Sequence, residues 1–138
     1  MPYWRLHYHL VWATRDREPL LGPEEEALVR RSIHLTAADL DLVPHAVGVM
    51  PDHVHVALSI PPKVAVAEAV KRLKGASAHG VNQSPSRADP STFGWQGEYG
   101  ALTFGDAALP SVVAYIQNQA NHHAENRLWP KLERAQET

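Results

Sequence analysis

Hydrophobic and polar residues alternate along the first part of the chain, in the stretch WRLHYHLVWAT that spans residues 4–14. One face of an extended segment there would carry Leu6, Tyr8, Leu10 and Trp12. The other face would carry His7, His9 and Val11. Alternation with a period of two residues is typical of a half-buried strand, so the pattern predicts a first β-strand.

Two later segments repeat their apolar residues at helical spacing. The first begins at Pro23 with three glutamates, a favourable helix start, and is predicted to run to about Asp39. The second lies within residues 61–81, where two prolines end the preceding strand and Val66, Val70 and Leu73 mark an apolar stripe. The pattern therefore predicts two helices that flank residues 42–60.

The stretch between these helices predicts a hairpin. LVPHAVGVM (42–50) and HVHVALSI (53–60) are both typical of strands, and Pro51 and Asp52 between them are turn residues. After the second helix, residues 82–94 are rich in Ser, Pro and Asn and predict a loop. YGALTFG (99–105) predicts a last strand, and residues 109–129 predict a final helix.

The resulting order is β-α-β-β-α-β-α, whose first six elements are those of the ferredoxin-like split arrangement. We therefore expect an α+β fold with an antiparallel sheet and an extra C-terminal helix. Two helices would cover one sheet face, and the other face would be left for the final helix or for a partner. A chain of 138 residues fits one domain, 1–138, whose polar tail 131–138 is expected to fray.

Composition narrows the class of protein only a little. Lys and Arg number 13 against 15 Asp and Glu, a formal charge of −2, which neither indicates nor excludes a nucleic-acid partner. The absence of cysteine rules out disulfides and thiolate ligands, and it fits a cytoplasmic location. No apolar run resembles a signal peptide or a membrane span, so no membrane partner is expected.

Two histidines on the third predicted strand are candidate metal ligands. Side chains two residues apart on a strand share a face and lie about 7 Å apart at the backbone, so His53 and His55 can hold one divalent ion if a third ligand joins them. The alternative is a pair of half-exposed histidines bonded to water or to neighbours. A histidine-triad nucleotide hydrolase would need a third alternate histidine, and that position is Ala57.

The final predicted helix carries further polar groups. On a helical wheel its packing face gathers Leu109, Val113, Ile116, Ala120 and Ala124. A separate stripe, away from that apolar face, is expected to carry Tyr115, Gln119 and His122, with His123 beside it. The alternative is a solvated helix face with a tyrosine at its rim.

A tyrosine hydroxyl, with a usual pKa of about 10, is a poor nucleophile. To attack a phosphodiester it needs a metal that polarises the phosphate and charge that stabilises the phenolate. The strand histidines and the helix stripe together offer both.

Five segments resemble, in order, the single-tyrosine HUH transposase family, which includes the TnpA-type insertion-sequence transposases and the REP-associated tyrosine transposases. MPDHVHVALSI (50–60) resembles the family's histidine–hydrophobic–histidine signature, and YIQNQANHH (115–123) resembles its tyrosine helix. The other three segments are YHLVWATRDREPLL (8–21), LKGASAHGVN (73–82) and FGWQGEYGALTF (93–104).

The resemblance implies a transposase that cleaves and rejoins single-stranded DNA at hairpin ends. It implies Mg²⁺ or Mn²⁺ as the metal, with His53, His55 and Gln119 as ligands. Tyr115 would form a covalent 5′-phosphotyrosine link, which a free 3′-hydroxyl would later reverse. It also implies a homodimer, in which the tyrosine of one subunit can complete the partner's site.

Other residues are candidates for supporting roles. His122 and His123 could assist at the active site. Candidate DNA contacts are Lys71, Arg72, Lys74, Arg15, Arg17 and Trp95. For the charged residues the alternative is an ordinary solvated surface, and for Trp95 it is packing in the core.

Two other functions compete with this interpretation. One is a hairpin-binding dimer derived from a transposase, which would form no covalent adduct with DNA. The other is a small metal-dependent phosphohydrolase that acts on nucleotides and never traps DNA.

Overall fold

A computed structural model describes residues 3–85 and 93–119 of the chain. Its strands are β1 (His7–Ala13), β2 (Val43–Met50), β3 (His53–Ser59) and β4 (Gly100–Phe104). Its helices are α1 (Pro23–Asp39), α2 (Val66–Asn82) and α3 (Leu109–Gln117), with 3₁₀ turns η1 (Arg15–Arg17) and η2 (Asp106–Ala108). The predicted α+β order is confirmed.

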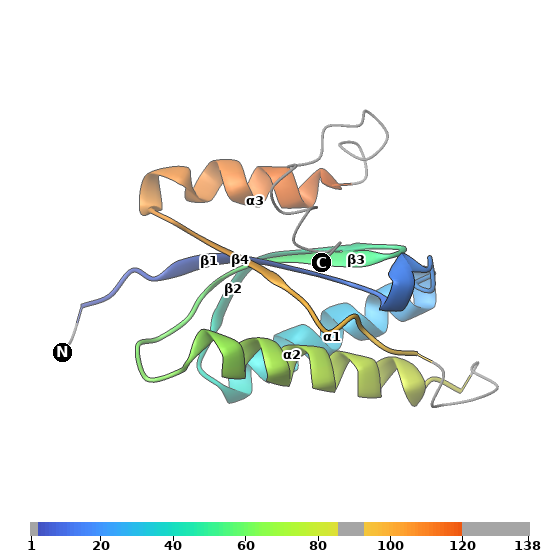
Figure 1. Cartoon of the computed structure of the whole chain (residues 1–138). Coiled ribbons are helices and arrows are strands. Elements are labelled where there is room, and N and C mark those ends of the chain that lie inside the picture. Colours follow the sequence, from blue (N-terminus) through green and yellow to red (C-terminus); the bar gives the residue numbers. More distant parts are fainter. Residues whose placement is uncertain (1–2, 86–92, 120–138) are drawn as a thin grey trace.

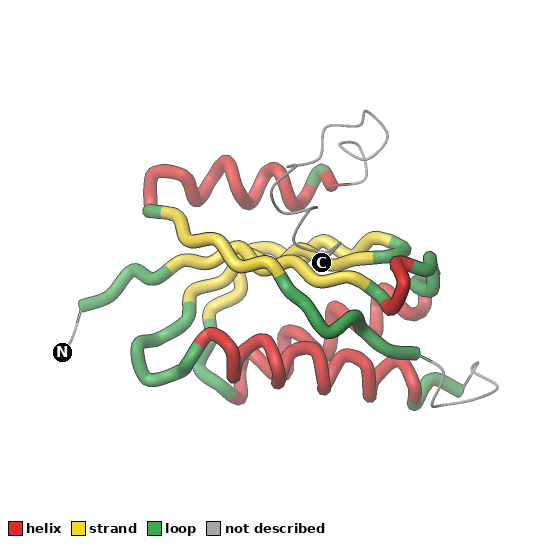
Figure 2. The backbone as a smooth tube through the Cα atoms, viewed as in Figure 1, coloured by secondary structure: helices red, strands yellow, loops and turns green. Residues whose placement is uncertain are grey.

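The four strands form one sheet, drawn in yellow in Figure 2. Their order is β2-β3-β1-β4, and every neighbouring pair is antiparallel. Central strands β1 and β3 pair so that His7 lies opposite Ser59 and Ala13 lies opposite His53. Because paired residues point to the same face, this register sets His7 and His9 on the face of His53 and His55, with His9 a diagonal neighbour of His55.

Helices α1 and α2 cover one face of the sheet, as Figure 1 shows. The apolar side of β1 faces them through Leu10 and Trp12, and β3 faces them through Val54 and Val56. These residues and the inner sides of the two helices form the main core. The alternation of β1 therefore sets its histidines on the opposite face.

Helix α3 covers that opposite face (Figure 1). A second, smaller apolar cluster joins α3 to the sheet, and its members are Ala46, Ala57, Val112, Tyr115 and Ile116. The helix approaches β2 closely because Gly48 has no side chain: a Cβ atom there would lie 2.9 Å from the Ile116 carbonyl oxygen. Helix α3 thus covers the sheet face for which the sequence predicted either the final helix or a partner.

Some boundaries differ from the prediction. The extended segment begins before β1, but residues 4–6 have no strand partner on β4, so the strand starts at His7. Residues 120–129 of the predicted final helix and the tail 131–138 lie outside the described residues. Over the described ranges, no helix combines the length and the apolar character that a bilayer crossing requires.

Candidate active site

His53 and His55 lie side by side on the face of β3 that α3 covers. Both side chains are 0% exposed, and their ring centroids are 5.1 Å apart. The alternative of half-exposed surface histidines is therefore wrong. The rings share a face because Val54, the residue between them, points into the main core.

Asp52 orients the first of these rings. Its carboxylate oxygen Oδ1 lies 2.6 Å from His53 Nδ1. An ionised carboxylate only accepts hydrogen bonds, so this contact places a proton on Nδ1 and leaves Nε2 as the nitrogen that can ligate a metal. Arg17 Nη2 lies 3.5 Å from the other carboxylate oxygen of Asp52.

His9 orients the second ring, although the sequence pattern did not predict it as a site residue. Its Nε2 lies 2.9 Å from His55 Nδ1. Burial, and then the nearby charge of His55, lower the pKa of His9 to about 3, so the ring is neutral near pH 7. A hydrogen bond to His55 Nδ1 directs the other nitrogen of His55, Nε2, to any ligand.

Tyr115 of α3 lies over these imidazoles. Its ring centroid is 5.8 Å from that of His55 and 6.2 Å from that of His9, and the residue is only 6% exposed. The prediction that Tyr115 lies away from the packing face is wrong, because the helix packs on the sheet through Tyr115 together with Val112 and Ile116. Small residues on the sheet, such as Ala57, make room for this side of the helix.

Gln119 follows Tyr115 by one turn and is 2% exposed. Within the described part of the chain, neither its amide oxygen nor its amide nitrogen has a hydrogen-bond partner. A buried amide without a partner is costly, so this side chain is suited to hold a ligand.

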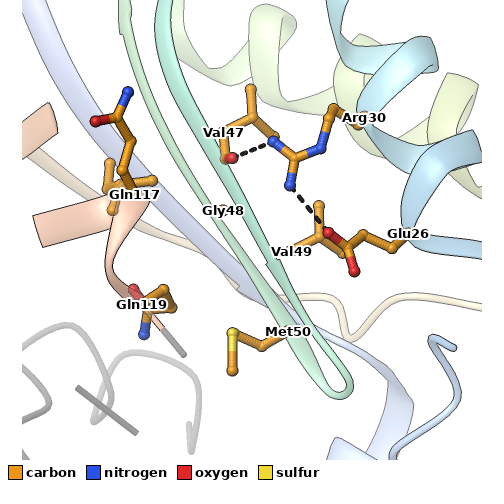
Figure 3. Close-up of a pocket in the computed structure, with 9 residues that line it drawn as sticks. Glu26, Arg30, Val47, Gly48, Val49, Met50, Gln117 and Gln119 are labelled. Atoms are coloured by element: carbon orange, nitrogen blue, oxygen red, sulfur yellow. Dashed lines mark hydrogen bonds and ion pairs between the residues drawn. The ribbon is translucent and has the colours of Figure 1, made fainter. Parts of the chain in front are cut away.

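Gln119 also lines a hollow of about 240 Å³ at the edge of β2. In Figure 3, Gln117 and Gln119 lie on one side of this strand, and Arg30 and Glu26 of α1 lie on the other. Arg30 donates a hydrogen bond to the Val47 carbonyl and pairs with Glu26 at 3.1 Å. Met50, which also lines the hollow, lies opposite His53 in the β2–β3 register.

The side chains present fit a divalent metal of the kind that prefers mixed nitrogen and oxygen ligands. Among the described residues, no group of three or more His, Cys, Asp or Glu side chains is arranged to hold a metal ion. A metal held by the two imidazoles would therefore need a ligand of another kind, and the buried amide of Gln119 is a candidate of that kind. His122 and His123 lie outside the described residues.

The candidate DNA contacts fall into two groups. Lys71, Arg72 and Lys74 belong to α2, on the sheet face opposite Tyr115 (Figure 1). Arg72 is paired with Asp39 at 2.6 Å, and Lys74 donates to the Gln96 carbonyl at 2.5 Å. Burial lowers the pKa of Lys74, while Glu98 opposes that shift.

Trp95 is partly buried and packs against the main core. Its indole nitrogen donates to the Lys74 carbonyl at 3.0 Å, and its ring meets Trp12 edge-on with centroids 5.9 Å apart. The packing alternative therefore describes Trp95 better than base stacking. Arg15 and Arg17 form η1, directly after the end of β1 that lies opposite His53, so they flank the candidate site.

The arrangement defines a class of protein in which a tyrosine helix crosses the histidine-bearing face of a ferredoxin-like sheet. Residues 2–119 match the family model of the IS200-like transposases. The chain therefore belongs to the IS200-like transposase family, in agreement with the motifs in its sequence.

Individual relatives agree with this assignment. The chain is 32% identical to the ISDra2 transposase TnpA of Deinococcus radiodurans over 119 residues, which cover 84% of this chain and 85% of the relative. It is also similar to a crystal structure from D. radiodurans R1 assigned as a transposase, with a TM-score of 0.65, 28% identity and coverage of 92% and 95% of the two chains.

A third similarity concerns the fold alone. A REP-associated tyrosine transposase solved with a REP hairpin has a TM-score of 0.66 and 17% identity, and the match covers 94% of this chain and 81% of that one. The antiparallel sheet with its three helices is therefore a tyrosine transposase fold.

Proposed function

We propose that this transposase cleaves and rejoins single-stranded DNA at hairpin ends through a covalent bond to Tyr115. The observation that carries the proposal is the position of the Tyr115 ring, 5.8 Å from that of His55, whose ring in turn lies 5.1 Å from that of the buried His53. Gln119 is buried close to Gly48, the residue paired with His55 in the β2–β3 register. The family membership supports DNA transposition, and the hairpin in the structure of the REP-associated relative supports the form of the substrate.

The proposed reaction is a phosphoryl transfer in which one phosphoester bond forms as another breaks. The Tyr115 hydroxyl oxygen bonds to the scissile phosphorus while the bond from phosphorus to the 3′-oxygen breaks. The phenol loses one proton and the departing 3′-oxygen gains one, which leaves a 3′-hydroxyl and a 5′-phosphotyrosine. Attack by a 3′-hydroxyl reverses the step on the same or another strand, so no nucleotide triphosphate is consumed.

His53, His55 and Gln119 would hold Mg²⁺ or Mn²⁺. When bound, such an ion polarises the scissile phosphate and offsets the negative charge of the transition state. Asp52 and His9 would keep the two imidazoles in the orientation that ligation requires. The packing of α3 on the sheet would hold the phenol beside the phosphate.

A covalent-trapping assay tests the proposal. Labelled single-stranded hairpin DNA is incubated with Mn²⁺ and run on a denaturing gel, and the wild-type chain is expected to give a shifted covalent band. Tyr115→Phe should reduce that band by about a thousandfold or more, because it removes only the nucleophilic oxygen. Tyr3→Phe, at an exposed position, is the matched control and should keep the band.

The same assay separates the competing functions. His53→Ala should abolish metal-dependent cleavage and spare hairpin binding. Hairpin binding by the wild type without any covalent band would indicate a non-catalytic DNA-binding dimer. Turnover of small nucleotides that survives Tyr115→Phe would indicate a phosphohydrolase.

The proposal includes a homodimer. Leu102 of β4 lies opposite His9 in the β1–β4 register and so points to the face that α3 covers, yet it is 39% exposed. Among the described residues, helix α3 contacts mainly β2 and β3, and the exposed side of Leu102 is available to a second copy. In the chain described here Tyr115 lies beside the histidines of its own subunit.

A further inference from the structure

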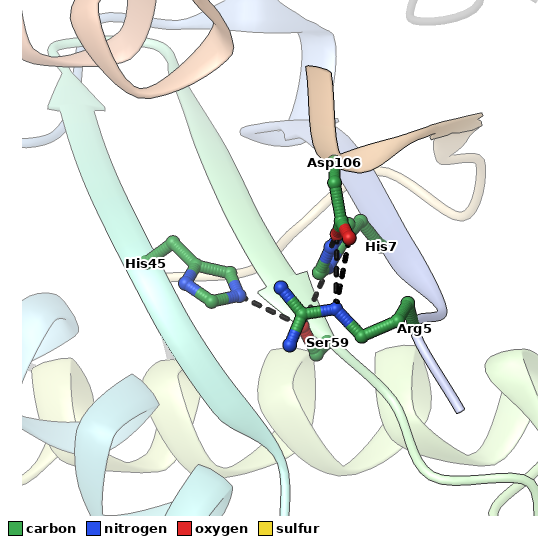
Figure 4. Close-up of polar contacts among 5 residues, drawn as sticks. All are labelled: Arg5, His7, His45, Ser59 and Asp106. Carbon is green, nitrogen blue, oxygen red and sulfur yellow. Dashed lines mark hydrogen bonds and ion pairs between the residues drawn. The ribbon is translucent and has the colours of Figure 1, made fainter. Parts of the chain in front are cut away.

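A second polar cluster lies on the same sheet face as the candidate active site, at the other end of the strands. It consists of Arg5, His7, His45, Ser59 and Asp106, drawn in Figure 4. Ser59 and His55 are four residues apart on β3, which corresponds to about 13 Å along the strand. The cluster is therefore separate from the candidate metal ligands but within reach of the same bound strand.

Hydrogen bonds connect the members of this cluster in a chain. His7 Nε2 lies 2.5 Å from Asp106 Oδ1, and His7 Nδ1 lies 2.8 Å from Ser59 Oγ. His45 Nε2 lies 2.7 Å from the same hydroxyl oxygen. Ser59 has one proton to donate, so one of the two rings must donate to it and the other must accept from it. The serine is thereby held in one orientation.

Arg5 presents unused donors to this cluster. Its Nε donates to both carboxylate oxygens of Asp106 at 3.0 Å. No hydrogen bond joins its two terminal nitrogens to any described residue, and in Figure 4 the guanidinium extends toward Ser59 and His45. A guanidinium fork with free donors is the usual protein group for a phosphate oxygen.

The walls of the adjoining hollow suit an anion. It measures about 170 Å³, the liquid volume of several waters, and is lined by Trp4, Arg5, His7, Val43, His45 and Ser59. No acidic side chain is among these lining residues, because Asp106 lies behind the guanidinium on its Nε side. The positive Arg5 opposes a metal ion here and favours a phosphate.

Trp4 extends the site with an aromatic surface. The same indole also lines a second hollow of about 400 Å³, together with Asp41, Pro61, Pro62 and Lys63. An indole and two prolines beside an anion-binding hollow are the elements with which proteins hold a base next to its phosphate. Trp4 therefore lines both hollows.

We propose that this cluster and Trp4 bind one unpaired nucleotide of the single-stranded DNA substrate, with its phosphodiester on Arg5 and His45 and its base against Trp4. The inference rests on the proposed function, since it takes single-stranded DNA as the substrate. It adds a second anchor on the strand, a few nucleotides from the phosphate that Tyr115 attacks.

Protonation should be coupled to this binding. Burial lowers the pKa of His45, and the nearby charges of His7 and Arg5 lower it further. The charged or titratable groups around it are Arg5 before β1, His7 on β1 and Asp106 on η2, while β3 contributes the neutral Ser59. A bound phosphodiester raises the pKa of His45 again, so binding takes up a proton and should strengthen as pH falls from 7 toward 6.

The test measures binding without chemistry. A fluorescent oligothymidylate strand is titrated with the Tyr115→Phe chain in EDTA, and affinity is read by anisotropy. Arg5→Gln should weaken binding by about tenfold, the loss expected for a charge-assisted hydrogen bond to phosphate. Arg31→Gln, the same change on the exposed surface of α1 across the sheet, should leave the affinity unchanged.

Two further arms identify the ligand. Trp4→Ala should weaken binding of oligothymidylate but leave binding of an abasic strand unchanged, which a merely structural role for Trp4 would not produce. His45→Gln should remove the pH dependence, and circular dichroism checks that each variant is folded.

Equal affinity of the Arg5→Gln and parent chains for oligothymidylate would overturn the inference. So would saturable binding of inorganic phosphate that Arg5→Gln abolishes but that does not compete with the strand, because this site would then take a free anion and not the strand. Failure of the proposed function shows separately, as the absence of a covalent band from the wild type with Mn²⁺.

Discussion

His9 is the residue on which the geometry of the candidate site depends most, because it links β1 to β3 beneath Tyr115. Its ring contacts His55 through a hydrogen bond and faces the phenol at 6.2 Å between centroids. Alternation along β1 placed His9 on the histidine face, but only the pairing of β1 with β3 brings it to His55. Strand order is a long-range property, so the local pattern could not select this residue.

Removing His9 should weaken metal binding. His9→Ala takes away the group that orients His55, and the loss of such a partner typically costs 10- to 100-fold in metal affinity. Mn²⁺ affinity measured by calorimetry is the direct readout. His34→Ala, on the exposed surface of α1, is the control. Equal Mn²⁺ affinity of the His9→Ala and wild-type chains would exclude this role.

The carboxyl of Asp106, in the second polar cluster, predicts how the stability of the fold changes at acid pH. The hydrogen bond from His7, and then that from Arg5, lower the pKa of its carboxyl from the model-compound value of 3.8. A carboxyl with a lowered pKa in the folded state stabilises the fold above its unfolded value, and that contribution is lost as pH falls below about 4.

Asp106→Asn should therefore lower Tm at pH 7 and flatten the loss of Tm below pH 4. Thermal unfolding followed by circular dichroism between pH 3 and pH 7 measures both effects. Asp39→Asn removes another exposed Asp–Arg pair, with Arg72, and controls for the loss of an ion pair alone. The prediction would be contradicted if the Tm of Asp106→Asn fell below pH 4 as steeply as that of the wild type.

At the scale of elements, α3 is the element that assembles the site, because it presents Tyr115 to the sheet and Gln119 follows two residues after its end. The helical wheel assigned the apolar stripe to packing and set the tyrosine aside. This prediction for Tyr115 was wrong because the sheet surface beneath α3 is not apolar. That surface presents imidazoles and small residues, and a phenol packs against them as well as an aliphatic side chain does.

The close packing of α3 against β2 depends on Gly48. A Cβ there would lie 2.9 Å from the Ile116 carbonyl oxygen and 3.0 Å from its Cγ2 atom, so Gly48→Ala must push the helix away. We expect a cost of about 1–3 kcal/mol in unfolding free energy, as for other overpacked sites, and a marked loss of adduct formation. Urea unfolding and the trapping assay measure the two effects.

Gly97→Ala is the matched control, since a Cβ at that position meets nothing within 4 Å. It should leave both quantities near the wild-type values. If Gly48→Ala behaved like Gly97→Ala, the close approach of α3 to β2 would not hold in solution.

At the scale of the whole molecule, the fold could be predicted almost completely from periodicity. The helix bounds Pro23–Asp39 agree with the prediction, and the hairpin strands agree within one residue, because turn and cap residues mark their ends. The candidate site was predicted in part: His53, His55 and Tyr115 lie together, while His9 and Asp52 came only from strand pairing and turn geometry.

Leu102, which is exposed on the α3-covered face of β4, leads to a prediction about assembly. Leu102→Asp places a charge on the exposed apolar position of β4 and should convert a dimer into a monomer. Light scattering after size-exclusion chromatography measures the mass. Leu35→Asp, at an exposed leucine of α1, is the control and should remain dimeric. A wild-type chain that is monomeric at all concentrations would contradict the proposed homodimer.

The hydrogen bond from Arg30 to the Val47 carbonyl has a consequence for solution behaviour. Strand β2 ends the sheet, and a bare sheet edge invites strands from other molecules to add and grow into fibrils. Here an incoming strand would first have to displace a guanidinium that is also held by Glu26. Arg30→Ala removes this guanidinium from the sheet edge. The variant should therefore form thioflavin-positive aggregates under conditions in which it is still folded.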